Sequence, residues 1–247
     1  MECSQFLRSE MLLGAQSTQV LRQKRVILFG LGGVGSYAAE ILARAGIGEI
    51  TVVDHDTVSE TNLNRQLCAL HSTLGRPKAA VVRERLLDIN PACRVTAIEK
   101  MYQPACAKEF ALETYDYILD AIDNVTAKLS LAVEAQAAGV SLIACMGTGN
   151  KFDPMQFRVS DINRTSGDPL CRVMRKELRA RGVDRLQVVW SPELPVTPEG
   201  TPEQTGRRQT PGSLPFVPGA AGLLMAGTVV RALLQTAPEQ TREEELK

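Results

Sequence analysis

A glycine-rich turn is the first feature of the sequence that could do chemistry. The motif Gly30-x-Gly32-Gly33-x-Gly35 directly follows Val26 to Phe29, an apolar run with the composition of a buried strand. Apolar residues then recur at helical spacing from Val34 until Gly46. Backbone N–H groups at such a turn, together with the positive end of the helix dipole, bind phosphate groups. The turn therefore predicts a nucleotide site, and Asp54, at the end of the next predicted strand, is placed to bind a ribose.

These two features fit a nicotinamide-dinucleotide enzyme and an ATP enzyme equally well, and the residues that follow favour ATP. Asn62, Arg65 and Lys78 bring an amide and two cations to the same edge of the predicted sheet. Cations of this kind hold the β- and γ-phosphates while the α-phosphorus is attacked. Lys78 falls in the first turn of a helix, where a cation opposes the dipole, and an anionic ligand would explain that position. The alternative is a solvated surface lysine.

Two carboxylates follow another predicted strand. Asp120 and Asp123 lie just past its end, in Leu119-Asp-Ala-Ile-Asp-Asn124. We interpret Asp123 as a ligand for Mg²⁺ on the nucleotide phosphates. The alternative is that Asp123 only caps the following helix.

Strands and helices alternate along the first part of the chain, which predicts a Rossmann-like, doubly wound and mainly parallel sheet of the α/β class. Further strands are predicted at 50–53, 94–98, 117–121 and 141–145, with helices from about Pro77 and over 125–138. Alternating strands at 155–159 and 186–190 predict an antiparallel extension around a basic helix near 169–181. We divide the chain into a helical arm (1–24), an ATP-binding part (25–150), the extension in the same domain (151–236) with a mobile proline-rich loop (192–211), and a charged tail (237–247).

Composition excludes several classes of protein. The 247 residues carry 28 basic and 28 acidic side chains, so a nucleic-acid partner needs a local basic patch. Six cysteines lie at least thirteen positions apart, which excludes CxxC zinc pairs and is typical of reduced thiols in a cytoplasmic protein. The uncharged stretch 209–230 contains three prolines, and its helical part, 219–230, is shorter than a membrane span requires. We expect neither zinc nor a membrane.

The helix near 169–181 carries that local basic patch. Its basic residues at three-and-four spacing are Arg172, Arg175, Lys176 and Arg179. They are predicted to share one face suited to an RNA backbone, the alternative being a solvated helix face. Because only 4% of the residues are aromatic, we expect RNA recognition by shape more than by base stacking.

Four ordered motifs together resemble the ubiquitin-activating-enzyme-like (ThiF/MoeB) family, whose bacterial members adenylate carboxylates. They are Gly30-Leu-Gly-Gly-Val-Gly35, the segment 53–66, Gly75-Arg-Pro-Lys78 and Asp120-Ala-Ile-Asp-Asn124, and the resemblance runs from about Phe6 to Leu234. It implies that the glycines, Asp54 and Asp56 bind ATP, that Asn62, Arg65 and Lys78 bind its phosphates, and that Asp123 binds Mg²⁺. It also implies a homodimer in which Arg8 reaches the γ-phosphate across the interface, the alternative being an exposed arginine on a short helix.

Two departures from the family narrow the resemblance. Sulfur-carrier-activating members generally carry two CxxC zinc pairs, which are absent here, and the segments 146–154, 159–162, 173–179 and 211–218 are similar to the branch that dehydrates threonylcarbamoyladenosine in tRNA. The implied reaction is adenylation of the threonyl carboxylate, followed by ring closure by a carbamoyl nitrogen. Such a reaction needs no protein nucleophile. Cys171 remains a candidate nucleophile, because a helix N-terminus and Arg172 could lower its pKa.

Three other functions stay open at this point. The nearest alternative is an adenylyltransferase for the C-terminal glycine of a sulfur-carrier protein. The others are a nicotinamide-dependent oxidoreductase and a non-catalytic RNA-binding module. The resemblance implies tRNA and a second copy of the chain as partners, with a sulfur-relay protein as a further candidate.

Overall fold

A seven-stranded sheet forms the centre of the protein. The computed structural model describes residues 5–199 and 211–235. The strands lie in the order β3-β2-β1-β4-β5-β7-β6, and only β6 runs antiparallel to its neighbour. Their bounds are β1 Arg25–Phe29, β2 Glu49–Val53, β3 Arg94–Ile98, β4 Tyr117–Asp120, β5 Leu142–Cys145, β6 Arg158–Asp161 and β7 Gln187–Trp190. The order reverses between β1 and β4, which is where ligands bind in folds of this class.

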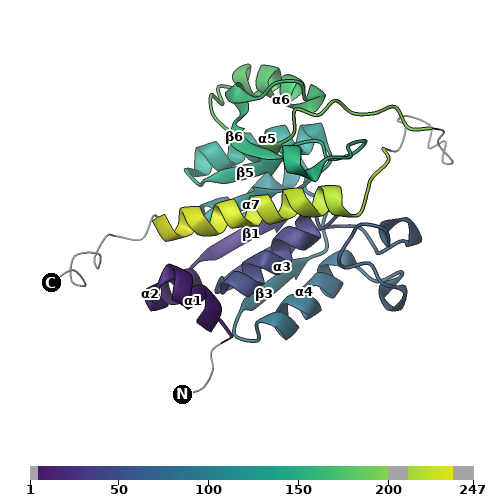
Figure 1. Ribbon diagram of the computed structural model, residues 1–247. Coiled ribbons are helices and arrows are strands. Elements are labelled where there is room, and N and C mark those ends of the chain that lie inside the picture. The colour runs from purple at the N-terminus through teal and green to yellow at the C-terminus, as the bar shows by residue number, and fades with distance from the viewer. Residues whose placement is uncertain (1–4, 200–210, 236–247) are drawn as a thin grey trace.

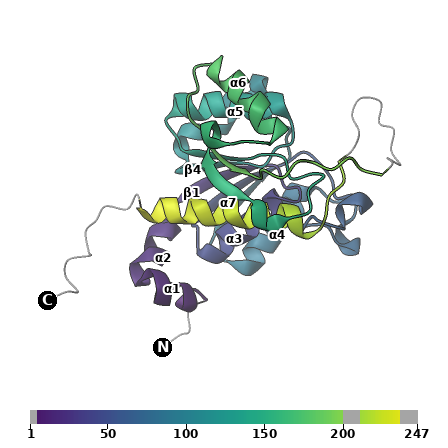
Figure 2. The same ribbon diagram turned by 45° about the horizontal axis from the view of Figure 1, so that its top comes forward.

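Helices cover both faces of the sheet (Figures 1 and 2). α3 (Gly35–Ala45), α4 (Lys78–Ile89) and α7 (Phe216–Gln235) pack on one face, and α5 (Val125–Ala138) and α6 (Pro169–Arg179) on the other. Two short helices, α1 (Leu7–Leu13) and α2 (Ala15–Arg22), precede β1. Short 3-10 helices span Glu60–Asn62, His71–Thr73, Pro104–Phe110, Leu112–Thr114, Pro154–Gln156 and Ile162–Arg164.

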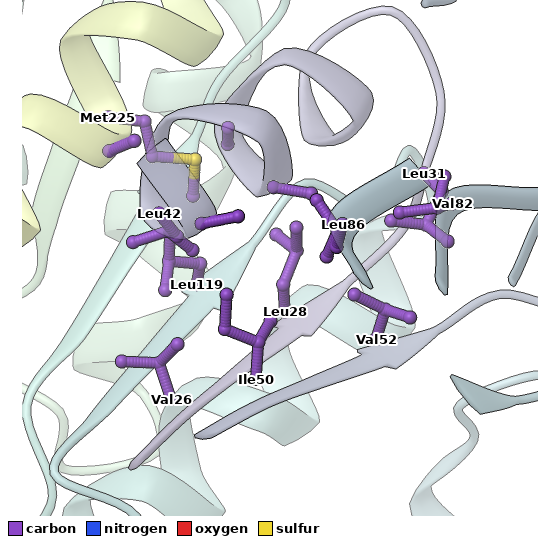
Figure 3. Close-up of a cluster of buried hydrophobic side chains, with 14 of the residues drawn as sticks. Val26, Leu28, Leu31, Leu42, Ile50, Val52, Val82, Leu86, Leu119 and Met225 are labelled. Carbon is purple, nitrogen blue, oxygen red and sulfur yellow. The ribbon is translucent and has the colours of Figure 1, made fainter. Parts of the chain in front are cut away.

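The core explains why the central strands are continuous apolar runs. Residues 26–29 of β1 are 0% exposed because helices cover both faces of a parallel sheet. Figure 3 shows Leu28 and Ile50 from the strands meeting Leu42 of α3 and Leu86 of α4. This packing fixes the carboxyl ends of the strands, where the polar residues lie.

The uncharged stretch 209–230 contains most of a helix that is longer than the predicted 219–230. α7 runs from Phe216 to Gln235 and is long and apolar enough, by length and composition, to cross a membrane. It instead packs along α3, and a Cβ on its Gly222 would lie 2.4 Å from the carbonyl oxygen of Val34. Glycine at this position therefore lets the two helix backbones approach closely. The burial of α7 agrees with the predicted core helix.

The extension differs from the prediction in two ways. β7 joins β5 in parallel, so only β6 makes an antiparallel pair. The strand predicted at 155–159 begins only at Arg158, because Pro154 starts a 3-10 turn in which Asp153 accepts a hydrogen bond from the N–H of Met155 at 2.9 Å. Residues 200–210 of the proline-rich loop and the predicted charged tail, 237–247, lie outside the described residues.

Candidate functional site

A cavity of about 880 Å³ opens at the carboxyl ends of β1, β2, β4 and β5. It brings together most of the residues that the sequence predicted for nucleotide binding. Those that line it are Gly30, Gly32, Gly33, Asp54, Asp56, Asn62, Arg65, Lys78 and Asp123. Gly35 does not line the cavity but packs against the backbone of Gly30 within the turn. Arg8 does not line the cavity either.

The glycines of the turn serve two different purposes. Gly30 has φ +87°, and a Cβ on Gly35 would lie 1.8 Å from the carbonyl oxygen of Gly30, so these two glycines are required by the backbone itself. A Cβ on Gly32 would meet only the Nε2 atom of Gln66, at 3.9 Å. The fold therefore does not require glycine at position 32. The open space beside its backbone, at the start of α3, suits a phosphate group.

Asp54 fastens the turn to the end of β2. One carboxylate oxygen accepts a hydrogen bond from the N–H of Leu31 at 2.6 Å, and the other accepts one from the N–H of Asp56 at 2.8 Å. Each carboxylate oxygen can accept more than one hydrogen bond. Asp54 can therefore hold the turn and still bind a ribose hydroxyl in the cavity.

Lys78 has a protein partner that the sequence analysis did not foresee. Its Nζ lies 2.9 Å from a carboxylate oxygen of Asp56, and its side chain is only 5% exposed. The alternative of a solvated surface lysine is therefore wrong. Asp56 also explains how a cation is tolerated in the first turn of α4, so the position of Lys78 is not in itself evidence for an anionic ligand.

Polar groups from one segment, 62–66, complete this side of the cavity. Arg65 donates hydrogen bonds to the carbonyl of Thr61 and the side chain of Asn64, both at 2.9 Å, and burial lowers the pKa of its guanidinium. Gln66, which the sequence analysis missed, is 7% exposed and its Oε1 atom has no hydrogen-bond partner among the described residues. A buried acceptor without a donor is costly, which points to a ligand or water at this place. The only signal for Gln66 in the sequence was its position directly after Arg65, a predicted phosphate ligand.

Asp123 does not cap α5. The cap is Asn124, whose Oδ1 atom accepts a hydrogen bond from the N–H of Ala127 at 3.0 Å. Asp123 is exposed in the cavity wall, and its carboxylate makes no ion pair or hydrogen bond within the described part of the chain. The capping alternative is therefore wrong, and the carboxylate has the freedom that a metal ligand needs.

A buried ion pair lies beneath Asp123. Asp120 is fully buried, and its Oδ1 atom lies 3.1 Å from Nζ of Lys128 and 3.0 Å from the N–H of Ile122. Desolvation raises the pKa of Asp120, and Lys128 opposes that rise. The pair holds the turn that presents Asp123. Lys128 was missed, although a lysine in register with Leu131 and Ala135 on the inner face of a helix is a recognisable signal.

Cys171 does not have the properties expected of a nucleophile. Its side chain is 0% exposed, and desolvation, with the nearby Asp168 carboxylate, raises the pKa of the thiol to about 12. The predicted lowering by the helix N-terminus and Arg172 is therefore wrong. Asp168 occupies that N-terminus itself, accepting a hydrogen bond from the N–H of Cys171 at 2.9 Å.

The basic face of α6 is narrower than predicted. Arg172, Lys176 and Arg179 are exposed, but Arg175 is half-buried and donates to the carbonyl oxygen of Thr165 at 2.9 Å. Arg175 therefore anchors the loop before α6 and does not share the exposed face. Leu170, in the first turn of α6, lines the cavity, whereas the exposed Arg172, Lys176 and Arg179 lie about half a turn away from it around the helix.

Arg8 is exposed on α1 and does not line the cavity. Phe6, next to α1, packs against Gly46 at the C-terminal end of α3, whereas the cavity lies at the N-terminal end of the same helix. An eleven-residue helix is roughly 16 Å long. Arg8 therefore has no access to the cavity of its own chain.

Comparisons with known proteins found a family model and similar sequences and structures. The model of the ThiF family matches residues 6–247. The tRNA threonylcarbamoyladenosine dehydratase of Bacillus subtilis is 40% identical over 241 residues, which cover 94% of this chain and 95% of that protein. A crystal structure of the Escherichia coli tRNA N6-threonylcarbamoyladenosine dehydratase in complex with ATP superposes with a TM-score of 0.85 at 32% identity, covering 96% of both chains. The Escherichia coli molybdopterin-synthase adenylyltransferase is 37% identical over 158 residues, which cover 64% of this chain and 61% of that protein.

Proposed function

Because the chain belongs to the ThiF family, we propose that it uses ATP to dehydrate threonylcarbamoyladenosine in tRNA to the cyclic form. The single observation that carries the proposal is one cavity that is lined by Gly32, with open space beside it, and by Arg65 and Lys78. That arrangement suits a polyphosphate. Similarity to dehydratases over 94% of the chain supplies the substrate class.

The reaction proceeds in two steps. A carboxylate oxygen of the threonyl group attacks the α-phosphorus of ATP, and pyrophosphate leaves with the bonding electrons. A carbamoyl nitrogen then attacks the activated carbonyl, AMP leaves with that carboxylate oxygen, and the nitrogen loses its proton. The nucleoside has thereby lost one water, and both reacting groups belong to the same molecule, which gives ring closure an intramolecular advantage.

The residues of the cavity hold the nucleotide and stabilise the departing charge. The N–H groups of the glycine turn face the phosphates, and Asp54 accepts hydrogen bonds from the ribose. Arg65 and Lys78 stabilise the pyrophosphate, while Asn62 donates from its amide. The free carboxylate of Asp123 fits a hard cation, and Mg²⁺ bound there would neutralise part of the phosphate charge.

The partners follow from the same assignment. The exposed basic residues of α6 contact the tRNA backbone beside the cavity. Two copies of the chain form a homodimer in which Arg8 of one copy completes the cavity of the other. The protein acts in the cytoplasm on its tRNA, and a sulfur-relay protein is a further candidate partner.

An adenylyltransferase for a sulfur-carrier protein is the second candidate. It would use the same nucleotide residues, and the similarity to the molybdopterin-synthase enzyme, which covers 64% of this chain, supports the shared chemistry. The basic face of α6 favours RNA over a carrier protein.

The test is incubation of the purified protein with ATP, Mg²⁺ and tRNA that carries threonylcarbamoyladenosine, followed by mass analysis of the nucleosides. We expect the modified nucleoside to lose one water, and Lys78→Ala and Arg65→Ala each to lower kcat/KM by roughly a hundredfold or more, as removal of a charge-stabilising group does. Glu113→Ala, at an exposed position that does not line the cavity, is the control for folding. An unchanged nucleoside, with pyrophosphate exchange only in the presence of a Gly-Gly-tailed carrier protein, would establish the second candidate instead.

A further inference from the structure

Three chain segments meet at the mouth of the cavity and form a rim, which we define as residues 149–155, 193–196 and 211–216. Gly149, Pro211 and Ser213 line the cavity itself. The other residues of the rim adjoin these three in the chain or are joined to them by hydrogen bonds. The rim therefore lies beside the cavity.

Asn150 joins the three segments of the rim. Its N–H donates to the carbonyl of Gly212 at 2.8 Å, its Oδ1 atom accepts from the N–H of Gly212 at 2.6 Å, and its carbonyl accepts from the N–H of Val196 at 2.8 Å. Asn150 adopts φ +58°, a conformation that asparagine tolerates better than most residues. Glu193 adds a second connection, because its carboxylate accepts from the N–H groups of Phe152 at 2.8 Å and Asp153 at 3.2 Å. Hydrogen bonds thus join the three segments of the rim.

The rim carries exposed aromatic side chains. Phe152 is 58% exposed and Phe216 is 53% exposed, whereas the other four phenylalanines, at 6, 29, 110 and 157, are all buried. Exposed aromatic groups held by a fixed backbone mark an interaction surface. Both exposed phenylalanines of the chain therefore border one opening.

We propose that Phe152 and Phe216 stack on the nucleobases that flank the modified adenosine. This inference rests on the proposed function. The threonyl carboxylate must enter the cavity to react. The bases next to the modified adenosine in the single-stranded anticodon loop then remain at the mouth of the cavity. Proteins read such unpaired bases by stacking them on aromatic side chains. The exposed basic residues of α6 lie outside the cavity and would contact the RNA backbone away from the rim.

The test compares two substrates, an anticodon stem-loop RNA that contains threonylcarbamoyladenosine and the isolated modified nucleoside. We expect Phe152→Ala and Phe216→Ala each to raise KM for the stem-loop roughly 5- to 100-fold, the loss of one stacked base, with kcat at saturation unchanged within about twofold. Phe→Tyr at either position should restore KM, and Phe→Leu should not. Activity on the isolated nucleoside should be the same in all variants.

A spectroscopic readout separates stacking from a merely structural role. The base 2-aminopurine, placed beside the modified adenosine, should lose fluorescence on binding to the wild type and to the Phe→Tyr variants, but not to the Phe→Leu variants. Leu70→Ala is the control, because Leu70 is an apolar side chain that is 53% exposed, as Phe216 is, but it lies outside the cavity lining and the rim, and it should leave KM unchanged within about twofold.

Two results would overturn the inference while leaving the proposed function intact. One is a Phe→Leu variant that binds the stem-loop as the wild type does. The other is an equal loss of activity on the stem-loop and on the isolated nucleoside. Weaker binding of a Gly-Gly-tailed carrier protein by the Phe→Ala variants, with RNA binding unchanged, would assign the rim to a protein partner. Wild-type protein that dehydrates neither the stem-loop nor the isolated nucleoside would instead refute the proposed function.

Discussion

Cys171 and Asp123 show how strongly the surroundings of a side chain decide its chemistry. Both residues stand beside the start of a helix, where sequence alone permits a nucleophile, a ligand or a cap. The thiol of Cys171 is enclosed by apolar groups and faces the Asp168 carboxylate, which raises its pKa to about 12. The carboxylate of Asp123 is exposed in the cavity and has no partner in the described part of the chain. The buried group is therefore inert and the exposed one is available.

Replacement of Cys171 by alanine should leave the dehydration reaction intact. We expect kcat/KM of Cys171→Ala to stay within about threefold of the wild type, because a thiol whose pKa is raised to about 12 is protonated at neutral pH and cannot act as a nucleophile. The thiol should also resist iodoacetamide in the folded protein at pH 8. Rapid alkylation, or a covalent acyl-enzyme seen by mass spectrometry, would contradict this assignment.

The unit of β1, the glycine turn and α3 is the element on which the site depends. Its backbone requires glycine at positions 30 and 35, whereas the space at position 32 is open. Asp54 ties the turn to β2, so two neighbouring strands set the position of the phosphate site. The ligand rather than the fold explains the glycine at position 32.

Alanine substitutions in this turn should separate folding from binding. Gly35→Ala puts a Cβ 1.8 Å from the carbonyl oxygen of Gly30 and should lower the melting temperature or prevent folding. Gly32→Ala should keep the wild-type melting temperature but weaken ATP binding at least tenfold, because its methyl group occupies the phosphate site. Thermal unfolding and calorimetric titration with ATP measure the two effects. Equal ATP affinity in Gly32→Ala and the wild type would show that the phosphates do not bind at this turn.

At the scale of the whole molecule, Arg8 does not line the cavity of its own chain. Helix α1, which carries Arg8, buries none of its residues and exposes Met11 and Leu12 to 77% and 87%. An apolar surface of this kind is suited to contact with another protein. The proposed homodimer would bring α1 of one copy to the cavity of the other.

Mixing two inactive variants should test this arrangement. Arg8→Ala and Lys78→Ala should each be inactive alone, but in a mixed dimer one of the two cavities contains both an intact Lys78 and an intact Arg8. After the variants are mixed in equal amounts and allowed to exchange subunits, we expect about a quarter of wild-type activity. An Arg8→Ala protein with full activity, or a mixture that stays inactive although sedimentation shows mixed dimers, would rule out a role for Arg8 in the partner's cavity.

Local sequence patterns predicted the framework of the fold, and the long-range pairings were beyond them. The glycine turn and the helix at 125–138 are confirmed. They could be predicted because the signals for each lie within a short segment of the sequence. The parallel direction of β7, the pairing of Lys78 with Asp56 and the burial of Arg175 depend on which segments meet in space. The residues predicted to bind the nucleotide could be grouped from the sequence because the carboxyl ends of parallel strands meet at one edge of the sheet. The roles of Gln66, Lys128 and the rim required the structure.

The ion pair between Lys78 and Asp56 also bears on which anions the protein admits. Before any nucleotide arrives, Lys78 already has a counter-ion that is tethered beside it and cannot diffuse away. A small anion such as chloride or inorganic phosphate would have to compete with this carboxylate through a single contact. A polyphosphate that also contacts Arg65 and the glycine turn competes through several contacts at once, so its advantage multiplies. We therefore expect the pair to act as an internal competitor that disfavours simple anions relative to the proposed nucleotide.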